Sequence, residues 1–409
     1  MYIIPYPDNN RIPITRYFQV KCDGKGLRAS LISWASFDFA ETIFSASILS
    51  VFFPLWLTGS LGGQPLHYSI AYSSSLLISV ILAIIVGRYA DKSGKRKSLF
   101  LTAVFLSSLS LFILSNIETL SGALVVFFFV NLFYQQGLVL YNSLLPSVSQ
   151  EENRAFSSGV GVALGYVGGA TGLYLISRLS PVETFAFILT AIGFFSFSLP
   201  AWFFVKEKPF KAIEGVSIKK ILKDRGFLLF ILSCLFLTEA AHALILFMSI
   251  YLSKVYGIDR HETVILIATS ALVAAVSSPF IGRLSDRVGV SRVFGLLFPA
   301  WSGALFIFPF MPQFFVYPMG ITFGILLASL WTTIRPSLLK LSPKEEVATR
   351  FAFLSLSERM AAIIGPLWWG LMVEVADYRI ATLTLAFFPL IGWLIYRIHR
   401  RRLQNSPIP

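Results

Sequence analysis

The chain alternates between long apolar stretches and short polar segments. Twelve stretches are each close to the roughly 20 residues that a helix needs to cross a bilayer. They are residues 31–57, 68–87, 98–116, 120–145, 156–177, 183–205, 227–253, 263–282, 293–311, 313–335, 351–373 and 380–397. Each is continuous, whereas the strands of a membrane barrel alternate between apolar and polar residues over about 10 positions. The pattern therefore predicts an all-α integral membrane protein with twelve transmembrane helices.

Two polar segments recur at a nearly constant spacing. Gly-Arg-Tyr-Ala-Asp-Lys-Ser-Gly at 87–94 follows the second stretch, and Gly-Arg-Leu-Ser-Asp-Arg-Val-Gly at 282–289 follows the eighth, 195 residues later. The acidic pairs at 151–152 and 345–346 are 194 residues apart. We therefore predict two pseudo-symmetric six-helix halves, an architecture typical of transporters.

The domain boundaries follow from the same pattern. The longest internal hydrophilic segment lies after the sixth stretch and is predicted to link the two halves. The predicted divisions are a cytoplasmic N-terminal tail (1–30), an N-terminal half (31–205), a cytoplasmic linker (206–225), a C-terminal half (226–397) and a cytoplasmic C-terminal tail (398–409).

Composition and charge exclude the soluble function classes. Hydrophobic residues make up 56% and charged residues 13%, while soluble domains carry about 25% charged residues. With both termini in the cytoplasm, 29 of the 34 Lys and Arg residues fall in predicted cytoplasmic segments and 4 in external loops. This is the distribution that membrane topology requires, so the net charge of +13 does not indicate a nucleic-acid partner.

Enzyme and cofactor signatures are absent from the sequence. It has no Walker loop. Its four histidines are scattered over a loop, a helix and a tail, which argues against a metal site built from several histidines. The two cysteines offer no disulfide framework. We expect a monomer in the cell membrane that is not an enzyme and needs no cofactor or metal.

The repeated segments resemble a known family. Both are similar to the signature cytoplasmic loops of the major facilitator superfamily. Within it, residues 34–40, 141–146, 165–169 and 365–367 resemble the autophagy-related vacuole effluxer branch and its prokaryotic relatives. The resemblance implies a central cavity lined by the first, fourth, seventh and tenth spans. It also implies alternating access and export of small solutes, with amino acids the best-supported class.

The two signature loops are candidate gating elements. In the superfamily they hold the halves together on the cytoplasmic side and release when the halves rock. The positions that match are Gly87, Arg88, Asp91, Gly94, Arg96, Gly282, Asp286, Arg287 and Gly289. From the residues alone, Gly87 and Gly94 permit a tight turn, and Asp91 can face the N-terminus of a neighbouring helix, where negative charge is favoured. The alternative interpretation is that the basic residues only fix topology.

Charged side chains inside the predicted spans mark a second candidate site, because inserting one costs about 3 kcal/mol. They are Asp38, Glu41, Glu239, Glu358 and Arg359. Glu239 lies at the centre of the seventh span, with His242 three residues later on the same face. Carboxyl groups in low-dielectric sites hold their protons to higher pH than in water, and histidine titrates near neutral pH. Glu239, His242 and Glu41 are therefore candidates for coupling protons to solute movement. The alternative is a permanently neutral Glu239 that is hydrogen-bonded to a neighbouring helix.

The other polar residues of the spans complete the candidate cavity. Asp38 is a candidate for binding or coupling, or alternatively ties the first span to a neighbour. Arg335 could bind an anionic cargo. The remaining cavity candidates are Asn131, Tyr134, Gln135 and Trp331. We expect Glu358 and Arg359 to form ion pairs with other helices or with the Asp91 loop rather than with each other.

Glycines recur at every fourth position in the fifth span, at 161, 165 and 169. Because no strand precedes them, the dinucleotide-binding context is missing. Small residues at this spacing allow close helix packing, which is the interpretation that we adopt.

These features predict a secondary active transporter that exports amino acids or similar small solutes and is coupled to protons. Its expected partners are the bilayer, a small-molecule substrate and protons; sodium is the alternative ion, because carboxylates and carbonyls also bind it. Two alternatives stay open. One is a multidrug-type exporter of hydrophobic cations, and the other is a non-transporting sensor or lipid-handling scaffold, which the 39 phenylalanines would suit.

Overall fold

The computed structural model describes residues 25–207 and 217–405. Within these residues the chain forms helices and connecting loops, without strands. Most of the predicted N-terminal tail, residues 208–216 of the predicted linker and the last four residues of the predicted C-terminal tail lie outside the described part.

The N-terminal half is a bundle of long helices. Its elements are α1 (Lys25–Phe44), a π-helical segment (Ser45–Phe52), α2 (Phe53–Gly59), α3 (Pro65–Ser93), α4 (Arg96–Leu114), α5 (Leu120–Ser143), α6 (Leu145–Val148), α7 (Arg154–Leu179) and α8 (Glu183–Phe204). The first predicted span is thus one continuous rod built from α1, the π-helical segment and α2.

The C-terminal half repeats this plan. A short helix, α9 (Ile218–Lys223), lies in the predicted linker and precedes this half. The elements that follow are α10 (Arg225–Tyr256), α11 (Arg260–Val288), α12 (Val290–Ile307), α13 (Val316–Lys340), α14 (Val347–Val375), α15 (Tyr378–Leu385) and α16 (Phe387–Asn405). Aspartate caps begin three of these helices: Asp224, Asp259 and Asp377 each accept a hydrogen bond from a first-turn backbone N–H. Such caps satisfy amides that have no partner within the helix.

Eleven helices in the described residues are long and apolar enough to cross a membrane. The twelfth, α14, has 29 residues, but Glu358 and Arg359 interrupt its apolar stretch. It nevertheless packs within the bundle, where Ala361, Gly365 and Trp369 are buried. The expectation of an all-α protein with twelve membrane helices in two halves is confirmed.

Several helices are longer than the apolar stretches that predicted them. We expected the second, eighth and tenth spans to end at residues 87, 282 and 335, whereas α3, α11 and α13 continue to Ser93, Val288 and Lys340. Most of each signature segment is therefore helix rather than loop. Hydropathy marks only the apolar part of a helix, and a polar last turn continues the same backbone hydrogen bonds.

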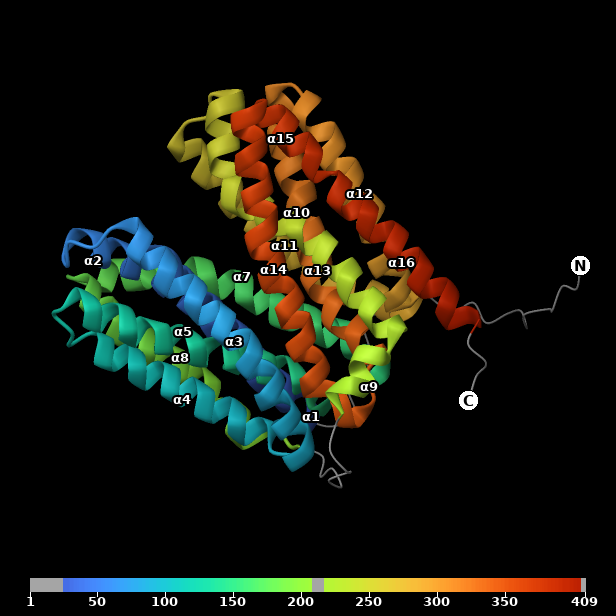
Figure 1. The fold of residues 1–409 in the computed structure, drawn as a ribbon, viewed down its shortest axis with the longest axis horizontal. Helices are drawn as coiled ribbons and strands as arrows, with labels where there is room; N and C mark the ends of the chain where they lie inside the picture. The colour runs from blue at the N-terminus through green and yellow to red at the C-terminus, as the bar shows by residue number, and fades with distance from the viewer. Residues whose placement is uncertain (1–24, 208–216, 406–409) are drawn as a thin grey trace, which may run out of the picture.

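The two halves form a V. Figure 1 shows the N-terminal helices (blue to green) and the C-terminal helices (yellow to red) meeting near α9 and the start of α1, and diverging toward α2 and α15. The end where they meet carries Asp91, Asp286 and Glu207, and we refer to it as the Asp91 end.

Close helix packing fixes the position of α1. A Cβ added to Gly168 of α7 would lie 2.4 Å from the backbone oxygen of Phe39, and Thr42 donates a hydrogen bond to the oxygen of Gly165 at 2.6 Å. The predicted packing role of the α7 glycines agrees with these contacts. As a result α7 lies directly against the α1 segment that carries Asp38 and Glu41.

Candidate functional site

At the Asp91 end, a carboxylate of one half binds the start of a helix of the other half. Asp91, near the end of α3, accepts hydrogen bonds from the backbone N–H groups of Ala348 (2.9 Å) and Thr349 (2.8 Å) and from the Thr349 hydroxyl (2.7 Å). These groups lie in the first turn of α14, where negative charge is favoured. Arg96 forms a salt bridge to Asp91 at 2.6 Å and also donates to the backbone oxygen of Lys344 at 2.8 Å. The predicted contact of Asp91 with a helix N-terminus is confirmed.

The second signature segment makes the equivalent contact in the opposite direction. Asp286 of α11 accepts hydrogen bonds from the backbone N–H groups of Ala155 (2.9 Å) and Phe156 (2.8 Å) at the start of α7. Each half thus supplies one carboxylate that binds the first turn of a helix in the other half. The pair of contacts closes the bundle at this end.

The glycines of the two segments serve different purposes. Gly94 and Gly289 follow α3 and α11 with φ of +67° and +103°, a backbone conformation that residues with a Cβ rarely adopt. Gly87 lies inside α3, so its predicted turn role is wrong. A Cβ added there would lie 2.8 Å from a backbone oxygen of α14, and one added to Gly282 would lie 2.5 Å from a backbone oxygen of α7. Both residues let helices of opposite halves touch.

The surroundings of the Asp91 and Asp286 contacts are polar. Arg88 and Arg287 are exposed side chains at this end. Glu207, just after α8, accepts a hydrogen bond from the backbone N–H of Lys97 at 2.9 Å. Its partial burial raises the pKa of the Glu207 carboxyl above the ordinary value, and this hydrogen bond opposes the rise. The same carboxyl lines a polar cavity of about 480 Å³ between the two halves.

Deeper in the bundle, an ion pair joins the two halves. Arg335 of α13 donates from both terminal nitrogens to the Asp38 carboxylate of α1, at 3.0 and 3.1 Å. The side chains are only 15% and 5% exposed. The guanidinium also lies over the rings of Tyr141 and Trp34, at 5.5 and 5.8 Å from the ring centres. This geometry fits the alternative that Asp38 ties the first span to a neighbouring helix. In this conformation the Arg335 guanidinium, which we expected to bind an anionic cargo, is bound to Asp38 instead.

Side chains from three helices form a polar cluster beside this pair. Glu41 of α1 accepts a hydrogen bond from the hydroxyl of Tyr134 on α5. The adjacent Gln135 donates to Asn131 at 3.1 Å and accepts from Arg359 of α14. Asn131 in turn donates to a serine of α3 at 2.6 Å. We call Glu41, Tyr134, Gln135, Asn131 and Arg359 the polar cluster; it brings together all the candidates of the fourth and first spans except Asp38.

The predicted ion pairs of Glu358 and Arg359 are not formed in the described part of the chain. Arg359 reaches another helix, as expected, but its acceptors are the Gln135 amide and the Ser355 hydroxyl and backbone oxygen. Asp91 cannot serve it, because Asp91 binds the first turn of α14 and ten residues of helix, about 15 Å, separate that turn from Arg359.

Glu239 and His242 lie on α10 in the C-terminal half. Glu239 is 1% exposed, and its Oε2 has no hydrogen-bond partner among the described residues. The alternative of a hydrogen bond from Glu239 to a neighbouring helix therefore finds no support at Oε2 within the described part of the chain. His242 Nε2 also lacks a partner in the described part, and its ring packs edge-on against Trp331 at 5.9 Å. The two residues are one turn apart, yet no hydrogen bond joins them among the described residues.

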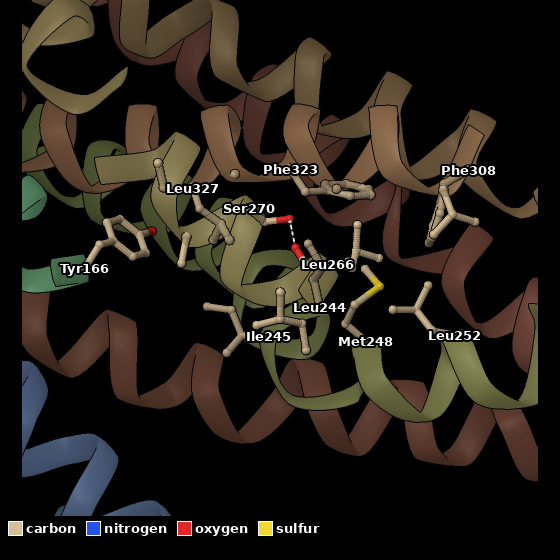
Figure 2. A pocket seen from close by; sticks show the side chains of 16 residues that line it. Tyr166, Leu244, Ile245, Met248, Leu252, Leu266, Ser270, Phe308, Phe323 and Leu327 are labelled. Atoms are coloured by element: carbon tan, nitrogen blue, oxygen red, sulfur yellow. Dashed lines mark hydrogen bonds between the residues drawn. The ribbon is translucent and has the colours of Figure 1, made fainter. Parts of the chain in front are cut away.

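Two features of the site were missed by sequence reasoning. Ser75 of α3, which accepts the Asn131 amide, belongs to a run of hydroxyl residues at 72–75, and this run was the available signal. An apolar pocket in the C-terminal half (Figure 2) had no signal, because its residues are ordinary for a membrane helix.

Comparison with known proteins identifies relatives over nearly the whole chain. A family model described as Major Facilitator Superfamily matches residues 42–259 and 228–409. A protein of Aquifex aeolicus (strain VF5) described as uncharacterized is 38% identical over 89% of this chain and 95% of its own length. A second relative, described as "Multi-drug resistance efflux pump PmrA homolog" of Lactococcus lactis subsp. lactis (strain IL1403), is 25% identical over 89% of this chain and 93% of its own length.

A solved structure shares the fold. The crystal structure of a bacterial homologue of the iron transporter ferroportin, in an outward-facing state, superposes with a TM-score of 0.75. It covers 93% of this chain and 100% of that one at 15% sequence identity, so the likeness concerns the fold alone. These matches do not test the branch assignment within the family, which stays a prediction.

Proposed function

Because the chain belongs to the Major Facilitator Superfamily and is therefore a multi-pass membrane transporter, we propose that it exports small organic cations in exchange for protons by alternating access. The observation that carries the cargo class is the buried Glu239 carboxyl, whose Oε2 has no partner in the described part of the chain. The efflux relative at 25% identity supports the export direction.

The interhalf contacts support alternating access. The helix-capping contacts of Asp91 and Asp286 close one end, while the halves diverge at the other (Figure 1). We place the Asp91 end, with both chain ends, in the cytoplasm, since 29 of 34 Lys and Arg residues fall on that side. The conformation would then face outward. Rocking of the halves would break these contacts and open the cavity to the cytoplasm.

The charges inside the bundle favour a cationic cargo. Glu41, Glu239 and Glu358 form no salt bridge in the described residues, whereas the Arg335 guanidinium is bound to Asp38. Buried carboxyl groups are stable when a cation neutralises them or when they are protonated. A cation and a proton therefore compete for the same acids. This competition would couple export of the cation to entry of the proton.

Amino-acid export is the second candidate, and a specific group favours it. The Arg359 side chain has a buried Nε without a hydrogen-bond partner among the described residues. Arg359 donates a hydrogen bond to Gln135, and Glu41 accepts one from Tyr134, which precedes Gln135 in α5. An ammonium bound to Glu41 and a carboxylate bound to Arg359 would satisfy a zwitterion.

Transport by purified protein in liposomes tests the proposal. Accumulation of tetraphenylphosphonium, a permanent lipophilic cation, would be measured beside a labelled amino-acid pool, with and without an imposed pH gradient. We expect gradient-driven accumulation of the cation, its loss in Glu239→Gln, and its retention in Glu374→Gln, whose side chain is exposed at the far end of α14.

The outcomes separate the candidate functions. Full gradient-driven transport by Glu239→Gln would overturn the assignment of that acid to coupling. Accumulation of amino acids instead of the cation would favour the second candidate. Binding of either solute without accumulation would favour the sensor or lipid-handling alternative.

A further inference from the structure

Arg350, in the first turn of α14, is bound through all three nitrogens of its guanidinium. Nε donates to the Glu346 carboxylate at 2.9 Å. One terminal nitrogen donates to the backbone oxygen of Leu341 at 2.7 Å, and the other donates to the Asp224 carboxylate at 2.9 Å. The guanidinium also lies over the ring of Phe227, 4.5 Å from its centre, and the residue is only 4% exposed. These bonds fix the guanidinium, because breaking one would leave part of a buried charge without a partner.

The partners of Arg350 come from two separate parts of the C-terminal half. Leu341 and Glu346 lie in the turn between α13 and α14, whereas Asp224 lies between α9 of the linker and α10. Asp224 has a second role, because its Oδ1 accepts a hydrogen bond from a first-turn backbone N–H and so caps α10. Ile221 of α9 is fully buried, so the described part of the linker is packed against the bundle. Arg350 therefore ties the linker to the start of α14.

The start of α14 is also the part of this half that binds Asp91. The backbone N–H groups of Ala348 and Thr349 and the Thr349 hydroxyl donate to the Asp91 carboxylate, and we call this the Asp91 contact. Arg350 is the next residue in the same turn of the helix. Hydrogen bonds weaken steeply when their angle departs from the ideal. The strength of the Asp91 contact therefore depends on the position of this turn, which Arg350 fixes from within its own half.

The equivalent arginine of the other half lacks these partners. Arg154 lies 196 residues before Arg350 and begins α7, the helix whose first amides bind the second signature segment. It forms no salt bridge in the described residues, and its buried Nε has no hydrogen-bond partner there. At the positions that correspond to Glu346 and Asp224, the N-terminal half has Gln150 and Arg28. Only one of the two interhalf contacts in the described structure is thus tied to the linker by an arginine.

We propose that Arg350 is a positioning residue that couples the linker to the Asp91 contact between the halves. While Asp224 holds the guanidinium, the first turn of α14 keeps the geometry that binds Asp91, and the Asp91 end stays closed. Displacing the linker from Arg350 weakens that contact and favours opening of this end. The inference rests on the alternating access of the proposed function. It adds that the linker controls the Asp91 contact and not the Asp286 contact.

Asp224→Asn tests this coupling with little damage to the fold. The asparagine keeps an oxygen that can cap α10, but it removes the charge that Arg350 binds. Distances between spin labels at Lys92 and Lys344, two exposed positions on opposite halves, would be measured in the full-length protein with its two cysteines replaced by serine. We expect the ratio of open to closed molecules to rise roughly two- to thirtyfold, the range for residues that act through a network of contacts.

Two backgrounds separate this coupling from a general loosening of the fold. In Asp286→Asn the Asp91 contact is intact and the closed state is weakened, so Asp224→Asn should raise the open fraction by the full factor. In Asp91→Asn the contact itself is already weakened, so Asp224→Asn should add little. Asp259→Asn is the matched control, because Asp259 caps α11 in the same way and forms no salt bridge in the described residues. This control should not shift the distances in either background.

The results distinguish failure of the coupling from failure of the proposed function. The coupling would be overturned if Asp224→Asn caused no shift in the Asp286→Asn background, acted equally in both backgrounds, or had the same effect as Asp259→Asn. The proposed function would stand in each of these cases. If Asp91→Asn and Asp286→Asn themselves left the distances unchanged, rocking of the halves about these contacts would be refuted, and the coupling with it.

Discussion

Replacing Asp91 by Asn should open the end of the bundle that this residue closes. The carboxylate accepts three hydrogen bonds from α14 and one salt bridge from Arg96, and its side chain is fully buried. The asparagine keeps one acceptor oxygen and presents an NH₂ group to donors. At about 1.5–3 kcal/mol for each hydrogen bond to a charged group, losing two of them costs the closed state about 3 kcal/mol or more.

This cost converts directly into populations. About 3 kcal/mol corresponds to a change of roughly a hundredfold in the equilibrium between closed and open states. A protein that is closed at this end in 99% of molecules would become about equally divided. Asp286 accepts two backbone hydrogen bonds and forms no salt bridge in the described residues, so Asp286→Asn should shift the equilibrium less.

Distances between spin labels on the two halves measure the shift. Labels at Lys92 and Lys344 report on the Asp91 end, and labels at Ser60 and Lys254 report on the opposite end; all four positions are exposed. In Asp91→Asn the first distance should lengthen and the second should shorten in the same molecules. Cys22 and Cys234 are replaced by Ser to prevent labelling at native sites.

Asp377→Asn is the matched control, because Asp377 caps α15 within its own half and bridges no halves. Unchanged distances in Asp91→Asn, or a larger shift in Asp286→Asn than in Asp91→Asn, would refute the argument that these bonds hold the gate closed.

Two further predictions concern packing and the interhalf ion pair. Gly168→Ala should lower the thermal unfolding midpoint, because its Cβ would lie 2.4 Å from the backbone oxygen of Phe39 and overpacking costs about 1–3 kcal/mol. The control Gly193→Ala should not lower the midpoint, because the space around Gly193 is open. Equal midpoints in the two variants would contradict the close α1–α7 contact. Asp38→Asn and Arg335→Gln should each lower the unfolding free energy by about 3–5 kcal/mol, because each leaves one buried charge unpaired, and the double variant should lose less than the sum. Additive losses in that double-mutant cycle would show that the pair is not coupled.

Local sequence patterns were enough to predict the helices, the two halves and the contact that Asp91 makes between them. Each depends on information that lies close together in the chain: about 20 apolar residues in a row, or an eight-residue segment that occurs twice. The Asp91 contact was predictable for the same reason, since a carboxylate at the end of one helix is stabilised by the amides at the start of another. Hydropathy could not locate the helix ends, because a polar last turn continues the helix without an apolar signal.

Which polar groups meet depends on how the helices pack in three dimensions. Asp38 and Arg335 are 297 residues apart, and Gln135 and Arg359 are 224 apart. Periodicity shows which face of a helix is polar, but the partner of that face depends on how every helix is rotated and placed. For this reason the expected ion pairs of Arg359 were wrong, Gly87 served helix contact rather than a turn, and the apolar pocket had no signal in the sequence. A hollow between helices is a property of packing, and residues that line it do not differ from those that fill a core.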